Sequence, residues 1–310
     1  MSFFRSSITA LAAAALALSV SAAPRLFGVN PFNNGTESNP QRAPNALTPA
    51  DYGFYEFSSS TGALVATRII TVPGRTITGA VALTLDPTTG IAYAVAKATG
   101  VSGGRLLITI NLDTAVGTEV GNLGDNFSSL AFRADGQLFG VTGDGATVPE
   151  TLYMINKATG AKTLATALGN GADGEVIAFN PNDGAFYHFS GGTVVFERVQ
   201  ATAPYAVTPI VTGLTGVGEV FGAVWDPSRN AFLVSDINST LFVVNTSGTV
   251  TSTVGTFPTD IRGLILLPDA FVAEYRVVPT LGTAALIALL LSVGIVGFVR
   301  VRSLQRSRSQ

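Results

Sequence analysis

The stretch LTLDPTTGIAYAV, residues 83–95, joins two short apolar runs by a turn that contains Asp, Pro and Gly. The same pattern returns three times along the chain, as LAFRADGQLFGV from residue 130, IAFNPNDGAFYHF from residue 177 and AVWDPSRNAFLV from residue 223. Apolar runs on both sides of such a turn are typical of a β-hairpin. Equivalent turn positions, occupied by Pro87, Ala134, Pro181 and Pro227, lie 47, 47 and 46 residues apart. A period of this length predicts a repeat protein.

Two more strands are predicted after each hairpin. The third strands read RLLITINLDT, TLYMINKATG, TVVFERV and TLFVVNTSG, and all but TVVFERV are followed by a clear polar or glycine-bearing turn. Four strands in a unit of about 40–47 residues are the pattern of a β-propeller blade. No amphipathic segment of helical length separates the strands, which disfavours a parallel α/β fold.

The two ends of the repeat region complement each other. A fifth fragment, RGLILLPD from residue 262, supplies only an inner strand, while RLFGVN from residue 25 resembles QLFGVTG from residue 137, and residues 52–74 resemble the segment from residue 151. We therefore predict an all-β, five-bladed β-propeller over residues 23–269. Its shared closing blade would take the inner strand from residues 261–268 and the other three strands from residues 25–72. A six-bladed ring would need strands within residues 31–51, where Asn and Pro are frequent.

Alternation in the first strand of each blade predicts which side chains form the core around the centre of the ring. These are Leu83, Leu85, Leu130, Phe132, Ile177, Phe179, Val224 and Leu264. Repeated Thr-Gly pairs, at residues 61–62, 99–100 and 159–160, predict turns in which glycine takes a positive φ.

The two termini of the chain differ from the repeats. Residues 1–22 combine Arg5, an apolar run and small residues, the three parts of a secretory signal peptide; the run is short for an uncleaved anchor, the alternative. Leu281–Val299 carries no charge and, at about 1.5 Å per residue, is long enough as a transmembrane helix. Basic residues stay on the cytoplasmic side of a membrane. We therefore expect export, with the body outside the cytoplasm and the helix in the inner membrane. The basic residues that follow the span are Arg300, Arg302, Arg306 and Arg308.

The C-terminal segment, residues 278–310, also resembles a known sorting signal. The motif Val278, Pro279, Thr280 and Leu281, followed by the apolar span and the arginines, resembles the bacterial IPTL-CTERM signals, relatives of PEP-CTERM, with Val in place of Ile. The resemblance implies a partner protease of the exosortase or rhombosortase kind in the membrane, removal of the tail, and delivery to the cell surface or beyond. It also implies a Gram-negative envelope and an association with extracellular polysaccharide. A permanent anchor is the alternative.

Residues 270–277 would link the propeller to this tail. The repeats themselves resemble secreted bacterial propellers with Thr-Gly turns, a likeness carried mainly by LYMINKATG.

Composition excludes several kinds of chemistry. The chain has no Cys, so disulfides, thiol catalysis and zinc–thiolate sites are excluded. Residues 23–277 hold 13 basic and 20 acidic residues, and a formal charge near −7 disfavours binding to nucleic acid or anionic lipid. The sequence has no phosphate-binding loop and no EF-hand loop. The single histidine, His188, is surrounded by aromatic residues in the sequence and is predicted to be a packed residue.

Acidic residues fall into two sets by their place in the predicted blades. One set lies in loops that lead into the innermost strands and should surround the mouth of the channel, with Arg75 in the remaining blade and Asp144 and Asp236 in neighbouring loops. Such a ring is a candidate site for Ca²⁺ or for a polar ligand such as a sugar, and a solvated rim is the alternative. The ring comprises Asp125, Asp173, Glu175, Glu219 and Asp260. The second set lies in hairpin turns at the opposite face, where Asp accepts hydrogen bonds from the turn backbone. It comprises Asp86, Asp135, Asp183 and Asp226.

These patterns favour an exported, surface-sorted, non-catalytic binding module that would bind extracellular polysaccharide or a surface protein without a cofactor. A glycoside hydrolase is the alternative. It would use Glu175 as the acid and Glu219 as the helper, with two carboxyl groups about 5–9.5 Å apart. The body offers a single tryptophan, Trp225, for stacking against sugars. A third hypothesis is a structural matrix protein.

Overall fold

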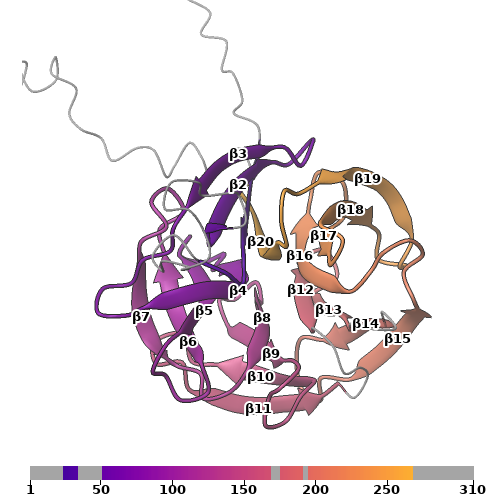
Figure 1. Cartoon of the computed structure of the whole chain (residues 1–310). Helices are drawn as coiled ribbons and strands as arrows, with labels where there is room; N and C mark the ends of the chain where they lie inside the picture. Colours follow the sequence, from indigo (N-terminus) through magenta and orange to yellow (C-terminus); the bar gives the residue numbers. More distant parts are fainter. Residues whose placement is uncertain (1–23, 34–50, 169–174, 191–194, 268–310) are drawn as a thin grey trace, which may run out of the picture. The chain divides into compact units, whose positions relative to one another are not determined.

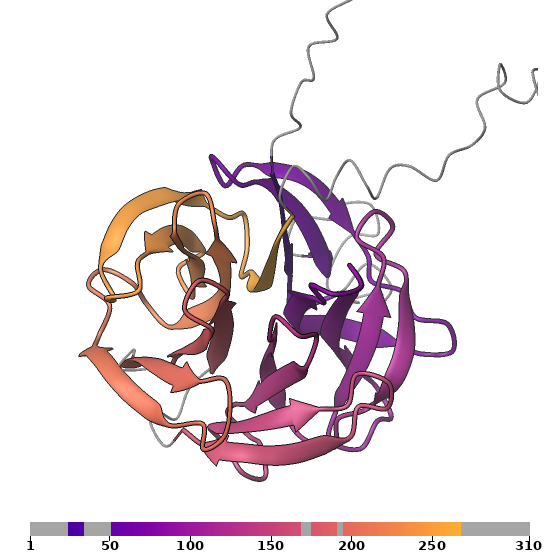
Figure 2. The same ribbon diagram turned by 180° about the vertical axis from the view of Figure 1, so that it is seen from behind.

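The computed structural model describes residues 24–33, 51–168, 175–190 and 195–267. These residues form twenty β-strands and no α-helix. The strands make five four-stranded sheets, which stand as blades around a central channel (Figures 1 and 2). The prediction of an all-β, five-bladed propeller is therefore confirmed.

Every blade has the same antiparallel order, from an inner strand beside the channel to an outer strand at the rim. The inner strands of blades 1 to 5 are β4 (Ile77–Leu85), β8 (Phe127–Phe132), β12 (Val176–Asn180), β16 (Val220–Asp226) and β20 (Arg262–Leu267). The second strands are β5 (Ala92–Ala98), β9 (Leu138–Thr142), β13 (Ala185–Phe189), β17 (Ala231–Asp236) and β1 (Arg25–Val29). The third strands are β6 (Arg105–Ile110), β10 (Thr151–Ile155), β14 (Val195–Gln200), β18 (Thr240–Val244) and β2 (Phe54–Ser58). The outer strands are β7 (Gly117–Asn122), β11 (Lys162–Ala167), β15 (Val207–Thr212), β19 (Val250–Thr256) and β3 (Leu64–Arg68).

Blade 5 joins the two ends of the described chain. Strand β1 pairs antiparallel with β20, so that Arg25 lies opposite Leu267 and Phe27 lies opposite Ile265. The other side of β1 pairs with β2, which pairs in turn with β3. The shared closing blade is thus built from the segments that the repeats predicted. Because β20 pairs with β1, the inner edge of β1 is covered, and an open sheet edge would be an aggregation hazard.

The core lies between the blades and around the channel. Phe139 of blade 2 meets Phe186 of blade 3 with ring centroids 4.8 Å apart, and Tyr187 meets Phe232 of blade 4 at 4.9 Å. Aromatic pairs at such distances add to the stabilisation that burial provides. Of the predicted core residues, five are almost fully buried and three, Leu85, Phe179 and Val224, are half-buried where they face the channel.

The two faces of the ring carry different loops. Each inner strand begins at one face, here called the top face, which also carries the loops from second to third strands. The bottom face carries the turns from first to second and from third to fourth strands. Glycine in the Thr-Gly turns has a positive φ, as predicted, with values of 69° at Gly62, 71° at Gly100 and 75° at Gly160. A side chain with a Cβ atom would be strained in that conformation.

Several predicted features lie outside the described residues. These are the signal peptide, the linker over residues 270–277, the sorting motif, the apolar span and the arginines after it. Within the part of the chain that the structure describes, no helix has the length and hydropathy needed to cross a membrane.

Candidate functional site

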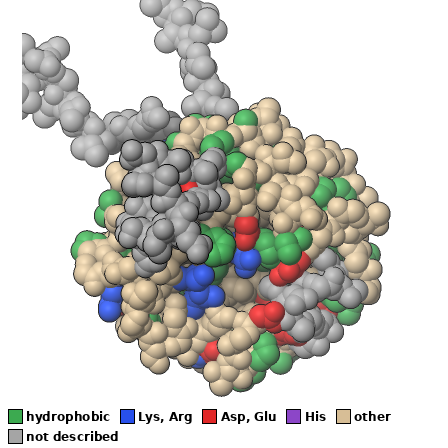
Figure 3. Space-filling model, in the orientation of Figure 1, with side chains coloured by type: hydrophobic (Ala, Val, Ile, Leu, Met, Phe, Trp, Pro, Cys, Tyr) green, Lys and Arg blue, Asp and Glu red, His purple; other side chains and the backbone are tan. Residues whose placement is uncertain are grey.

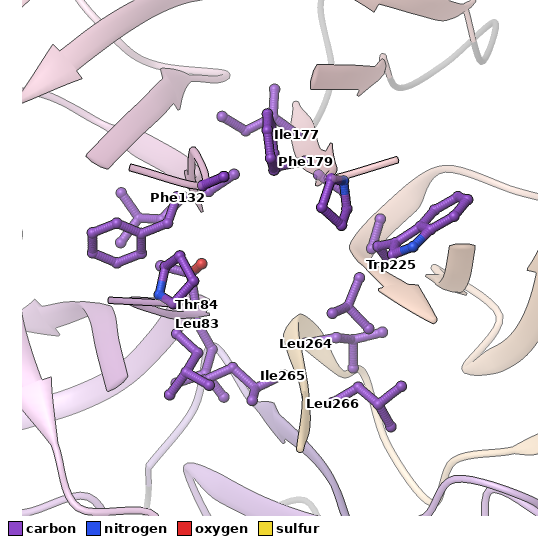
Figure 4. Close-up of a pocket in the computed structure, with 18 of the residues that line it drawn as sticks. Leu83, Thr84, Phe132, Ile177, Phe179, Trp225, Leu264, Ile265 and Leu266 are labelled. Atoms are coloured by element: carbon purple, nitrogen blue, oxygen red, sulfur yellow. The ribbon is translucent and has the colours of Figure 1, made fainter. Parts of the chain in front are cut away.

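The bottom half of the channel is apolar. A cavity of about 290 Å³ is lined by residues of all five inner strands and of the turns that follow four of them. Figure 4 shows their side chains arranged around this space, among them Phe132, Ile177 and Leu264. Trp225 also lines the cavity, and its indole Nε1 is buried without a hydrogen-bond partner among the described residues. An apolar cavity with so few polar groups offers little to orient a ligand.

The aspartates of the bottom face stabilise turns, as predicted. Asp86 accepts hydrogen bonds from Thr88 N at 2.9 Å and Thr88 Oγ1 at 2.7 Å, and Asp226 accepts from Ser228 N at 2.9 Å. Asp135 and Asp183 likewise accept from backbone donors within their own turns, Gln137 N and Ala185 N. Their role in the turns accounts for their recurrence along the sequence.

The top face is where charged side chains gather near the channel, as Figure 3 shows. Of the predicted acidic ring, Asp125, Glu175 and Asp260 make side-chain contacts within their own blades. Asp125 is held within blade 2, where it accepts from Lys162 Nζ at 2.9 Å and Thr147 N at 2.8 Å. Burial opposes the charge of Asp125, but the hydrogen bonds outweigh it and lower its pKa. This carboxylate fixes the loop between β9 and β10.

Other predicted members of the top-face set are engaged locally. Asp236 accepts from Gly218 N at 3.0 Å and Thr240 N at 2.9 Å and so organises the turn after β17. Arg75 forms an ion pair with Glu119 of β7 at 2.5 Å. Asp144 lies in the loop after β9, and its backbone oxygen accepts from the side chain of Asn126.

Glu219 is half-buried before β16, and its backbone oxygen accepts from Ile237 N at 2.8 Å. Asp173 lies outside the described residues. Over the described ranges no three His, Asp or Glu side chains are arranged to hold a metal ion.

Glu175 belongs to a buried charged cluster in blade 3. His188 turns one ring nitrogen, Nε2, to Glu175 and the other, Nδ1, to Glu197 at 3.1 Å, while Ser190 Oγ donates to Glu175 at 3.2 Å. All four side chains are fully buried. We call Glu175, His188 and Glu197 the Glu–His–Glu cluster. An imidazole that faces a carboxylate on each side donates from both nitrogens when it is protonated.

Burial and charge act on this cluster in opposite directions. Burial disfavours a charged His188, but its hydrogen bonds to Glu175 and Glu197 outweigh this effect and raise the pKa of His188 above its usual value. Burial also raises the pKa of Glu175. His188 is packed, as predicted, but among carboxylates rather than among aromatic rings alone. The prediction missed Glu197, and the signal available was a glutamate in the middle of the third-strand sequence TVVFERV.

A second feature of the top face is a pocket beside the channel, formed by blades 1, 4 and 5. It has a volume of about 430 Å³, and we call it the top pocket. The residues that line it include Phe32, Lys97, Arg105, Phe221, Asp260 and Arg262. Among the ring members that the structure describes, Asp260 lines this pocket.

The segment after β1 forms one wall of the top pocket because a glycine lets it approach the sheet. A Cβ atom on Gly79 of β4 would lie 2.0 Å from the backbone oxygen of Pro31. Ala80 N donates to Asn30 O at 2.8 Å, and Asn30 Nδ2 donates to Asp260 O at 2.8 Å. These contacts place Phe32 at the rim, where it is 53% exposed.

Basic side chains dominate the top pocket. Lys97 and Arg105 are opposite each other on β5 and β6, and Arg262 begins β20. Arg262 Nε pairs with Asp260 Oδ2 at 3.1 Å, and its guanidinium lies 3.8 Å from the centroid of the Phe221 ring. Burial, followed by the charges of Arg105 and Arg262, lowers the pKa of Lys97. Burial and the nearby Arg262 also lower the pKa of Arg105.

Comparison with known proteins gives no family. No family model matches the chain, and no curated protein matches it. Solved structures with similar folds include a chain of a nidogen/laminin complex, with 9% identity over 79% of this chain and 98% of that one, at a TM-score of 0.49. A Bacteroides caccae protein of unknown function has 10% identity over 79% and 99%, with a TM-score of 0.48. TolB from Acinetobacter baumannii has 12% identity over 79% and 67%, with a TM-score of 0.43. Such low identities and TM-scores give no ground for transferring a function.

Proposed function

We propose that this protein is a non-catalytic binding module that is exported, sorted to the cell surface and takes its ligand at the top face of the propeller. The main support for the proposal is that the acidic and basic groups on this face have different surroundings. The described carboxylates Asp125, Glu175 and Asp236 are committed to hydrogen bonds that hold the fold together. The basic groups of the top pocket, in contrast, face a space large enough for a small ligand.

The glycoside hydrolase alternative is less favoured because of Glu175. A hydrolase of this kind needs a carboxylic acid that can reach the glycosidic oxygen of its substrate. The carboxyl group of Glu175 has no exposure and is bonded to His188 and Ser190. A rigid, buried carboxyl group suits a structural role better than proton transfer to a large substrate.

Export and sorting are tested by the mass of the mature protein recovered from cells. Loss of residues 1–22 together with everything after the motif at residues 278–281 is the expected result. A variant in which Pro279→Ala and Leu281→Ala alter the motif should retain its tail and stay in the membrane fraction. A mature protein that keeps residues 282–310 would replace sorting with a permanent anchor. Retention of residues 1–22 would contradict the export of a cleaved protein.

Catalysis is tested separately on the mature protein. Incubation with arabinan and xylan oligosaccharides should release no reducing ends. Release that disappears in Glu175→Gln, with an unchanged melting temperature, would favour the hydrolase instead. Sedimentation of the same sample distinguishes a binding module, which stays small as its concentration rises, from a matrix protein that self-assembles.

A further inference from the structure

The top pocket holds more positive charge than its own carboxylate can balance. Lys97, Arg105 and Arg262 lie around it, and among the residues that the structure describes Asp260 is the one acid that lines it. Of the basic side chains that the structure describes, Lys97 and Arg105 are the two that form no ion pair. Every other described Lys or Arg has a carboxylate within 4.0 Å. The imbalance is therefore specific to this pocket.

Arg105 carries the clearest sign of a missing partner. Its Nε atom is buried and has no hydrogen-bond partner among the described residues. Lys97 Nζ donates to the backbone oxygen of Pro31 at 3.1 Å, which leaves its charge without a counterion. A buried charged donor without a partner is unfavourable, and a carboxylate is an acceptor whose geometry matches a guanidinium. Burial, followed by the nearby positive charges, holds the pKa of Lys97 below its usual value, and a bound anion would offset the repulsion between the charges.

The walls of the pocket are aromatic and aliphatic. Phe32 is 53% exposed and Ile237 is 50% exposed, and both line the pocket. Lys97 Nζ lies 5.5 Å from the centroid of the Phe32 ring. Large apolar side chains at the rim of a charged pocket favour a ligand whose anionic group is attached to a flat or apolar body.

We propose that the top pocket binds an organic anion in which a carboxylate is attached to a ring, with the carboxylate on Arg105 and Lys97 and the ring between Phe32 and Ile237. This inference deepens the proposed function and rests on it, because it names the ligand class of the same face. The pocket volume of about 430 Å³ accommodates one ring with its substituents. Arg262 is held by Asp260 and by the Phe221 ring, so it contributes to the field of the pocket from a fixed position.

The test uses the full-length chain in a non-ionic detergent and follows ligand binding by saturation-transfer NMR. The probes are benzoate, glucuronate, acetate and benzyl alcohol. We expect benzoate or glucuronate to bind more tightly than acetate, which lacks the ring, and than benzyl alcohol, which lacks the charge. A preference for glucuronate identifies a sugar acid, and a preference for benzoate identifies an aromatic acid. Affinity should fall as NaCl is added, because salt screens the attraction.

Variants assign the binding to the pocket. Loss of a hydrogen bond to a charged group predicts that Arg105→Gln weakens binding about tenfold or more. Phe32→Ala, at the exposed rim, should weaken it several-fold without lowering the melting temperature. The matched control is Arg198→Gln, whose guanidinium pairs with Asp183 at 3.2 Å on the bottom face and should leave the affinity unchanged.

Three results would overturn the inference. The first is that neither benzoate nor glucuronate binds. The second is that Arg105→Gln and Phe32→Ala bind the ligand as tightly as the parent chain does. The third is that benzyl alcohol binds as tightly as the carboxylates. None of them bears on the masses of the mature termini, which test export and sorting independently.

Discussion

The bottom face of the propeller repeats itself from blade to blade, whereas the top face does not. Asp86 in blade 1 and Asp226 in blade 4 each accept a hydrogen bond from the backbone and the hydroxyl group of the residue two positions later. On the top face, by contrast, His188 has no counterpart. The residues at the same register in the second strands of blades 1, 2 and 4 are uncharged and buried: Ala94, Gly140 and Val234.

This difference separates the residues that form the repeated fold from the residues that are specific to this chain. A residue type that recurs in every blade serves a need that every blade has, such as closing a turn. The Glu–His–Glu cluster and the top pocket occur once each in the described residues, and each requires groups that the repeat does not provide. Charged groups that occur in one blade and not in the others are therefore the better candidates for specific roles. Their contributions to the free energy of unfolding should also differ from those of the turn aspartates.

The largest effect is expected at the Glu–His–Glu cluster. His188→Ala would leave the buried side chains of Glu175 and Glu197 without the imidazole between them, and breaking such a buried charged set lowers the free energy of unfolding by about 3–5 kcal/mol. Urea unfolding of the purified chain measures this loss. The matched control is Val234→Ala at the aligned position in blade 4, which removes two buried methyl groups and should lose about 2 kcal/mol. Equal losses in the two variants would mean that His188 acts only by filling space.

The same cluster should limit stability at alkaline pH. The folded-state pKa of His188 is raised, so its contribution is fully present below the unfolded value of about 6.5 and is lost as the pH rises through the folded value. Glu175 has a raised pKa as well and acts in the same direction. Urea unfolding between pH 6 and pH 9 should show a decline of up to about 1.4 kcal/mol per pH unit for each proton released.

The control for this decline is His188→Leu. Without the imidazole, the loss of stability should move to lower pH, where the buried carboxyl group of Glu175, whose pKa is raised by burial, ionises. A parent chain whose stability is flat from pH 6 to pH 9 would contradict the assignment of a protonated His188.

The fold could be predicted from the sequence because it depends on repeated features. The hairpins around Pro87, Ala134, Pro181 and Pro227 recur at a nearly constant spacing, which predicted four blades, and the two ends of the repeat region predicted the fifth. The pairing of β1 with β20 was predictable for the same reason, since residues 25–30 match a second strand and residues 261–268 match an inner strand. These are comparisons between parts of one chain, and they need no knowledge of side-chain contacts.

The candidate site could be predicted only in part, because it depends on contacts that no repeat encodes. The loops that enter the inner strands were predicted to surround the channel mouth, yet Asp125 is bonded to Lys162 within its own blade. The sequence did not predict Lys97, Arg105 and Phe32 as site residues, because none of them belongs to a repeated pattern or a motif. They meet only because blade 5 closes against blade 1 and because Gly79 lets the segment after β1 lie on β4.

A smaller effect is expected where the top pocket depends on that close approach. Gly79→Ala would place a Cβ atom 2.0 Å from Pro31 O, so the segment that carries Phe32 must shift. Overpacking of this kind lowers the free energy of unfolding by about 1–3 kcal/mol. Benzoate or glucuronate binding should weaken in parallel. Gly143→Ala is the milder control, since its Cβ would meet the side chain of Ser128 at 3.0 Å. Unchanged stability and affinity in Gly79→Ala would show that the wall of the pocket does not depend on this contact.

The smallest effect is expected on the bottom face, where each turn is one of several alike. Asp86→Ala removes the bonds to Thr88 and the ion pair with Lys157 of blade 2 at 2.5 Å, and should lower the free energy of unfolding by about 1–2 kcal/mol. Burial opposes the charge of Asp86, but its bonds to Lys157 and Thr88 outweigh it and lower its pKa to about 2. The contribution of Asp86 is therefore present above its unfolded pKa and lost as the pH falls toward 2.

The control is Asp113→Ala, whose carboxylate is 61% exposed in its pair with Arg25 and should change stability by less than about 0.5 kcal/mol. If Asp86→Ala proved as costly as His188→Ala, the repeated and the unrepeated charges would be equivalent, and the contrast between the two faces would not hold.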